Sequence, residues 1–412
     1  MSGVLPWTLP AGEIGTAFGA EWRIDRHGLY GISPYSAGQM YPSGNFGQNF
    51  EGKQHAEEGF LEVQLPILRD TFVQTLNLDL AGRLTHYSNS GLVETWKVGL
   101  QSQIIDDVRF RLTWSHDIRA PTIWDLSAPG ARNLQTCASF IQGPGGSNNG
   151  NPNICYAING GNPTLNPERA NTIAAGFVVT PTFLDGLTVS LDWYQIHLSG
   201  GITTPGFAEV INRCRAGEVQ AYCGSLTFAN GLPYPAGTTS QIDFVQLKPV
   251  NAGQFTTAGF DMNIAYGFDL FTGQMDVSFN GNYAYDFSRT LNGIYFQGAG
   301  GSGYYTGGAK FQGTLNFNYR EGAWSFGVQN RINGEELLNL GNQGNPAIPV
   351  QGALPGQAGV TYSRDALTGQ IVPAVVAGQR DLVTGAETNY QAMRVTTDLR
   401  VQYRWSNNIT LF

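Results

Sequence analysis

The sequence predicts an all-β fold, an antiparallel transmembrane β-barrel, and three observations support this prediction. Polarity alternates with a period of two along many segments, as it does in a strand that lies between two different media. These segments are about 9 to 12 residues long, close to the length that a tilted strand needs to cross a bilayer and longer than most soluble strands. The composition agrees, because 54 residues are Gly, 12% are aromatic and only 13% are charged.

The alternation is easily seen in the segment 187–194, which reads LTVSLDWY, with apolar residues at the odd positions. The segments 109–116, 276–285, 311–319 and 395–405 have the same pattern. Applying it along the chain, we expect strands near 14–25, 56–66, 73–87, 92–104, 107–118, 170–182, 186–198, 251–267, 273–287, 309–319, 323–332, 390–404 and 408–412.

The connections between these strands alternate in length. Every second connection is short, beginning with residues 67–72 and 105–106, and all but one of the others are long; the exception is 88–91. We treat 241–248 as an extension within the loop 199–250, because a separate strand there would break the alternation. Long external loops that alternate with short periplasmic turns are typical of outer-membrane barrels.

Charge and motifs exclude several classes of protein. The 23 Lys and Arg residues against 31 Asp and Glu give a net charge of −8, without a basic run that would bind nucleic acid. No apolar run is long enough for a transmembrane helix, and the N-terminal residues MSGVLPW do not resemble a signal peptide. The five His residues are dispersed, and no nucleophile or phosphate-binding motif occurs. We therefore expect neither an enzyme nor a cofactor or metal site.

The four cysteines occur as two local pairs within loop-like sequence. This arrangement predicts two disulfides in an oxidising compartment, and the order of the sequence favours Cys137 with Cys155 and Cys214 with Cys223. Free thiols or a zinc site are the alternatives. The spacing is unlike CxxC and no His lies near either pair, which argues against zinc.

Two linked motifs follow the expected strand 107–118. One reads DIRAPTIWDL from Asp117, and the other reads GNPTLNPERA from Gly161. With the segments GLTVSLDWY and TAGFD further on, they resemble the barrel of TonB-dependent outer-membrane receptors, in which such motifs bracket one external loop. The resemblance extends from about residue 12 to the end of the chain.

This resemblance implies a barrel of about 22 strands whose lumen is filled by a plug domain. The thirteen expected strands correspond to about 13 of these 22. We therefore expect residues 1–412 to form a single partial barrel domain, a fragment without signal peptide, plug domain or final strand.

The second motif is expected to have a structural role. Pro163 and Pro167 fix φ and restrict the residues before them, so the chain re-enters the wall in an extended conformation. Glu168 is expected to accept backbone N–H groups or to pair with an Arg of the wall, and not to act in catalysis. The structural set comprises Arg119, Ala120, Pro121, Asn162, Pro163, Leu165, Pro167 and Glu168.

Two further sets of side chains are candidates for contact with a ligand. The first is expected to face the lumen, either along a substrate path or as ordinary barrel lining: Arg109, Arg111, His116, Arg400 and Arg404. The second consists of aromatic residues of the loop 26–55, whose faces suit sugars, aromatic chelates or peptides, unless they only pack the loops together: Tyr30, Tyr35, Tyr41, Phe46 and Phe50.

The resemblance implies a receptor of the bacterial outer membrane that imports a scarce ligand, such as a siderophore or a carbohydrate. Its partners are then the lipid bilayer and, through the plug, a TonB-type energy-coupling protein. The alternatives are a passive porin-like or structural barrel, and a secreted, disulfide-stapled glycan-binding β protein. The ligand itself is not indicated by the sequence.

Overall fold

A computed structural model describes the fold of most of the chain. It describes residues 1–30, 49–136, 154–216, 223–228, 242–291, 294–300, 308–337, 362–364, 371–373, 390–406 and 409–411. Cys137 of the predicted pair Cys137–Cys155 lies outside this description, as do the aromatic residues Tyr35, Tyr41 and Phe46. No helix in the described ranges is long and apolar enough to span a membrane.

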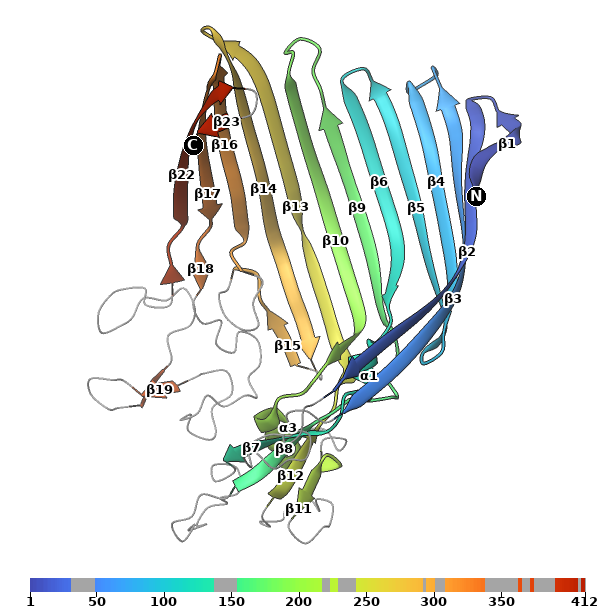
Figure 1. Ribbon diagram of the computed structural model, residues 1–412, viewed down its shortest axis with the longest axis vertical. Coiled ribbons are helices and arrows are strands. Elements are labelled where there is room, and N and C mark those ends of the chain that lie inside the picture. The colour runs from blue at the N-terminus through green and yellow to red at the C-terminus, as the bar shows by residue number, and fades with distance from the viewer. Residues whose placement is uncertain are drawn as a thin grey trace.

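One large, curved, antiparallel sheet dominates the fold (Figure 1). Its strands follow the order of the chain, and β15 (Ile294–Gln297) pairs with β14 beside this path. The strands on the path are β1 (Ser2–Leu9), β2 (Gly12–Leu29), β3 (Phe50–Arg69), β4 (Thr75–Tyr87), β5 (Gly91–Ile105), β6 (Val108–Arg119), β9 (Glu168–Val179), β10 (Leu187–Thr203), β13 (Val250–Leu270), β14 (Gly273–Leu291), β16 (Phe311–Glu321), β17 (Trp324–Asn333), β22 (Arg394–Ser406) and β23 (Ile409–Leu411).

The predicted all-β antiparallel fold is confirmed. Each of the thirteen expected strands has a counterpart on this path; the path also contains β1, which the sequence missed and which pairs with the first residues of β2. Among the described residues β1 and β23 are the two ends of the path, so the sheet is open.

The two ends of the sheet differ in their connections. At one end the strands are joined by short turns, such as 106–107 and 271–272, and at the other end lie long connections with both labelled helices (Figure 1). We call these the short-turn end and the loop end. The helices are α1 (Ile123–Ser127) and α3 (Phe207–Ala216). Two-stranded pairings β18 (Glu336–Leu337) with β21 (Tyr390–Gln391) and β19 (Tyr362–Arg364) with β20 (Ile371–Pro373) complete the described structure.

The alternation of polarity gives the sheet an apolar outward face. Large apolar side chains on this face remain exposed, for example Leu84 at 56%, Leu191 at 47% and Phe177 at 48%. Aromatic rings collect on it near both ends of the strands: Trp96 meets Trp114 toward the loop end, and Trp324 meets Tyr403 at the short-turn end. An apolar band flanked by aromatic girdles is the pattern of a wall that faces lipid.

A small second unit, which we call the loop module, is built from described parts of the connections 120–167 and 204–249. Its sheet has the order β11 (Leu226–Phe228), β12 (Ile242–Leu247), β8 (Ile154–Asn159) and β7 (Ala131–Thr136). β12 and β8 come from different connections and pair in parallel. Val210 and Ile211 of α3 are fully buried in its core beside Val245. β12 lies in the segment 241–248, which we expected as an extension within the loop 199–250, and its residues belong to this separate sheet.

Candidate functional site

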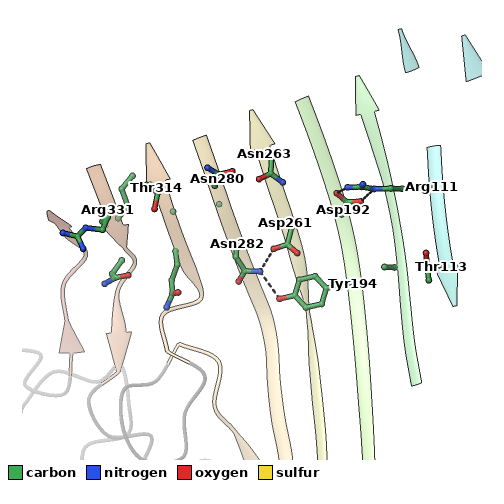
Figure 2. A pocket seen from close by; sticks show the side chains of 16 residues that line it. Arg111, Thr113, Asp192, Tyr194, Asp261, Asn263, Asn280, Asn282, Thr314 and Arg331 are labelled. Carbon is green, nitrogen blue, oxygen red and sulfur yellow. Dashed lines mark hydrogen bonds and ion pairs between the residues drawn. The ribbon is translucent and has the colours of Figure 1, made fainter. Parts of the chain in front are cut away.

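The inner face of the large sheet carries a polar hollow of about 800 Å³ between β6 and β17 (Figure 2). Side chains on alternate residues of each strand point into it, because successive side chains of a strand face opposite sides. Its lining includes Arg111, Asp192, Tyr194, Asp261, Asn282 and Arg331. Amide, carboxylate and guanidinium groups dominate this surface, so it suits water and polar partners.

The most distinctive contact of the hollow joins Arg111 of β6 to Asp192 of β10. Two hydrogen bonds form, of 2.7 Å from Nε and 2.5 Å from Nη2, one to each carboxylate oxygen. Strand β9 lies between them, and the residue in register with both is Gly176. A Cβ at Gly176 would lie 2.0 Å from Asp192 Oδ1. The ion pair therefore crosses the intervening strand only because that position has no side chain.

Hydrogen bonds and further ion pairs tie the strands beyond β10 together. The Asn282 amide donates to Asp261 Oδ1 at 2.8 Å and to the Tyr194 hydroxyl at 3.0 Å (Figure 2). Arg331 pairs with Asp398 at 2.7 Å, and Arg320 pairs with Asp276. In these pairs the charges are neutralised by a neighbouring strand of the same wall.

Four of the five residues predicted to face the lumen lie on the inner face. Arg111 lines the hollow, and Arg109 shares its face by alternation. Arg400 donates to Asn318 Oδ1 at 3.5 Å, and Arg404 lies on the same side of β22.

The prediction for His116 was wrong. His116 lies two residues after Trp114, on the face of β6 opposite to Arg109 and Arg111. It stacks on Trp96 with ring centroids 6.1 Å apart, and its Nδ1 lies 2.8 Å from Asn171 Oδ1. Because β6 pairs with β9 without a register shift, residue 116 cannot share a face with residues 109 and 111. His116 therefore belongs to the outward aromatic cluster.

At the loop end, the two sequence motifs meet as one ion pair. Arg119 and Glu168 are register partners, the last of the β6–β9 pairing. The guanidinium donates from Nε to Oε2 at 2.5 Å and from Nη2 to Oε1 at 2.8 Å. Glu168 Oε1 also accepts the Ile202 N–H of β10 at 2.7 Å. One carboxylate thus connects three strands where the long connections begin and end.

Glu168 is buried, with a relative exposure of 7%, and lies beyond the outward Trp114 band, outside the lipid-facing part of β9. Burial by itself raises the pKa of this carboxyl group. The hydrogen bond and charge of Arg119 and the Ile202 N–H outweigh that effect and hold the pKa below its ordinary value. The group is therefore a carboxylate at neutral pH.

A second network fixes the other motif residues. Asn162 accepts the Thr164 N–H at 3.0 Å, and its amide donates to the Pro249 carbonyl at 2.9 Å. Asn251, at the start of β13, accepts the Asn166 N–H and donates to its carbonyl, both at 2.8 Å, and also donates to the Gly200 carbonyl. The sequence did not single out Asn251; the available signal was its position two residues after Pro249, which ends a connection. Leu165 and Pro121 of the motifs are buried.

The first motif continues into α1, which packs across the wall onto β2 and β3. Thr122 and Asp125 form a reciprocal capping box that starts the helix. A Cβ at Gly52 of β3 would lie 2.2 Å from Ile123 Cγ2, so helix and strand are in close contact. The connection from β4 to β5, residues 88–90, is the one short connection expected at the loop end, and Ser88 forms hydrogen bonds with the backbone of His55. α1 thus joins the start of one long connection to β2 and β3.

The aromatic residues predicted to touch a ligand differ in their surroundings. Phe50 is only 7% exposed and makes edge contacts with His27 and Trp124, each with centroids 5.6 Å apart. Phe50 was predicted to be a possible ligand contact, and the structure corrects this: its ring packs α1 onto the sheet. Tyr30 is 72% exposed at the end of β2 and stays a candidate.

Cys214 of α3 and Cys223 form a disulfide, as the sequence predicted, and both are buried in the loop module. The bond attaches the end of α3 to the segment before β11. Within the described ranges, no group of three or more His, Cys, Asp or Glu side chains is arranged to hold a metal ion.

Comparison with known proteins identifies the family. The profile of the family described as TonB dependent receptor-like, beta-barrel matches residues 2–412, so the chain belongs to this family of outer-membrane receptor barrels. The resemblance inferred from the motifs is thereby confirmed. No curated protein sequence matches the chain.

Solved structures agree with this fold. The siderophore receptor PirA from Acinetobacter baumannii is 14% identical, with a TM-score of 0.57 over 99% of this chain and 48% of that one. A variant of the ferric enterobactin receptor PfeA from Pseudomonas aeruginosa, in complex with enterobactin, is 12% identical, with a TM-score of 0.59 over 99% and 46%. The chain thus spans about half the length of these receptors.

Proposed function

We propose that the chain is the barrel part of an outer-membrane importer, which captures a scarce ligand at its loop end and moves it inward with energy from a TonB-type partner. In this proposal residues 1–412 form one partial barrel domain and catalyse no reaction. The partner engages a plug domain, and the inner face of the barrel contacts that plug and the passing ligand.

The observation that carries the proposal is the network around Glu168. It ties β6, β9 and β10 together at the point where the connections 120–167 and 204–249 leave the wall. Asn162 and Asn251 link the same two connections again. A receptor needs loops held in a defined place above the lumen, since a pre-organised binding surface loses less entropy on binding. Ordinary connections between strands do not need this support.

The inner face argues against a passive porin. A charge-selective constriction uses rings of charged side chains that face the pore. Here Arg111 is paired with Asp192 and Arg331 with Asp398 within the wall. A secreted glycan-binding protein is disfavoured for a different reason, because its outward face would not carry large exposed side chains such as Leu84 and Phe177.

For the ligand, ferric siderophores are the first class to test. PirA is described as a siderophore receptor, and PfeA as a receptor for ferric enterobactin. The exposed Tyr30 offers one aromatic face at the loop end. Carbohydrates are the second class, because aromatic faces also stack on sugars.

The test uses the intact protein that contains this chain, expressed in a bacterium that lacks its own siderophore receptors. Uptake of radiolabelled ferric siderophores and of labelled oligosaccharides is measured with and without an uncoupler. We expect one ligand class to enter and the uptake to stop when the uncoupler is added. Uptake that continues unchanged in the uncoupler, or in a strain without the TonB-type protein, would show a passive pore instead.

Placement in the membrane is checked in the same cells. We expect a barrel of the outer membrane to appear in the outer-membrane fraction. We also expect its gel mobility to change when the sample is boiled. A protein recovered in the medium would support the secreted alternative.

A further inference from the structure

A second hollow, of about 600 Å³, lies across β2 to β5. Its lining includes Phe18, Leu61, Leu84 and Trp96, and its floor contains Gly59 and Gly82. All six belong to the outward set of their strands: Phe18 is in register with Leu61, Leu61 with Gly82, and Gly82 with Trp96. The hollow therefore opens on the side that faces away from the lumen. We call it the outer groove.

The outer groove exists because two glycines are left uncovered. A Cβ at Gly82 would meet no atom within 4 Å, and a Cβ at Gly59 would meet only the Gly19 carbonyl at 3.9 Å. The outward Gly281 of β14 differs, because the ring of Phe279 lies 2.7 Å from the position of its Cβ. In one case a neighbouring aromatic ring fills the space over a glycine; in the other the space stays open.

Four large apolar side chains border the outer groove, and one of them is held in place. Phe18 and Leu61 are each 53% exposed, although they border the hollow. Trp96 contacts Trp114 edge-on, with centroids 4.8 Å apart, and stacks on His116. Tryptophan rings at such a level mark the boundary between the apolar part of a bilayer and its head groups. Glu94, the register partner of Leu84, also lines the hollow on this face, two residues from Trp96 toward the loop end.

We propose that the outer groove is a binding site for an acyl chain of a membrane lipid. The inference depends on the proposed placement in the outer membrane. An empty groove in a lipid-facing wall loses dispersion contacts on every side that lacks partner atoms. A flexible hydrocarbon chain can lie between the four apolar side chains, and the glycine floor brings that chain against the backbone. Glu94 stays among the polar head groups.

The test is photolabelling of the intact protein in phosphatidylethanolamine vesicles that contain the same lipid with a diazirine in one acyl chain. After irradiation, labelled residues are mapped by mass spectrometry. We expect labelling of Leu61, Leu84 and Trp96 to exceed that of other outward residues such as Phe177. Filling the floor in the variant Gly59→Leu/Gly82→Leu removes this excess, whereas the matched control Leu191→Phe, on the outward face of β10, leaves it unchanged.

Two results would overturn the proposal. Labelling that is uniform over the outward face, and insensitive to the filled floor, would show that the outer groove has no preference for a chain. Absence of lipid label there, together with protein–protein crosslinks at Leu61 or Leu84, would assign it to a polypeptide. The change of gel mobility on boiling is recorded for each variant. A wild-type protein that never enters the vesicles would contradict the proposed function itself, and not only the groove.

Discussion

Two bidentate ion pairs each have their arginine on the same strand, β6, but have different surroundings. Arg111 and Asp192 meet in the middle of the inner wall, with side chains 49% and 17% exposed. Arg119 and Glu168 meet at the loop end, where the Glu168 side chain is 9% exposed and also accepts a backbone N–H. The first pair spans a strand by passing over a glycine, and the second is part of a network.

The difference teaches where electrostatics matters for stability. Exposed ion pairs contribute about 0–1 kcal/mol, because water solvates both charges in either state. Removing one partner of a buried pair costs more, since the remaining charge has lost its hydration without compensation. We therefore expect the loop end to depend on its ion pair and the wall to depend mainly on shape and strand pairing.

The largest effect is expected from Arg119→Met. The variant leaves the buried Glu168 carboxylate without its cation, at a cost of about 3 kcal/mol, the lower end of the range for buried pairs because Arg119 is half exposed. The measurement is urea-induced unfolding in lipid vesicles. An effect as small as that of Asp192→Asn would erase the distinction between the two pairs.

The same pair predicts a dependence on pH. The pKa of Glu168 is lowered in the folded state, so its stabilisation is complete above the ordinary carboxyl pKa and is lost as the pH falls through the lowered value. The wild-type protein is expected to be more stable than Glu168→Gln at neutral pH, and the two stabilities converge in acid. Parallel curves would contradict the role given to the carboxylate.

A second test at the loop end is Gly52→Val. The new side chain would overlap Ile123 and displace α1, with a cost of about 2 kcal/mol, typical of overpacking. Limited proteolysis of the segment after Pro121 reports the loss of docking. Gly82→Val is the matched control, because it adds the same residue to a strand where a Cβ meets nothing. Equal cleavage of both variants would show that α1 is not held by this contact.

In the wall, Gly176→Ala is expected to cost about 1–2 kcal/mol, because the methyl group meets the Asp192 carboxylate and the Leu191 carbonyl. Unfolding in vesicles measures the change, with Gly82→Ala as control. The combination with Asp192→Ala should recover part of the loss, since the side-chain part of the clash disappears. A combined loss equal to the sum of the two would mean that the residues do not interact.

The smallest effect is expected from Asp192→Asn. It removes a charge but keeps a hydrogen-bonding side chain beside Arg111, and exposed pairs contribute about 0.5 kcal/mol. The unfolding free energy is compared at low and high salt, and the small difference should shrink as salt screens the charges. A loss of unfolding free energy as large as that of Arg119→Met would mean that the pair Arg111–Asp192 is buried in the membrane-embedded protein.

The sequence alone determined thirteen strands of the large sheet, their order and the two faces of most of them. Alternation depends only on neighbouring residues, so LTVSLDWY is sufficient to define β10 and its outward side. His116 shows how the alternation rule can be misapplied, because a shift of one residue in the sequence moves a side chain to the other face of the strand. The motifs around Arg119 and Glu168 also indicated the family.

The tertiary structure decided which distant segments meet. β8 and β12 lie in different connections, and nothing in either segment specifies a parallel partner so far along the chain. Gly52, Asn251 and the buried Phe50 acquire their roles only when α1 and the connections pack against other strands. The physical reason is that strand alternation is encoded locally, whereas these contacts depend on the shape of surfaces that form only after the sheet has curved.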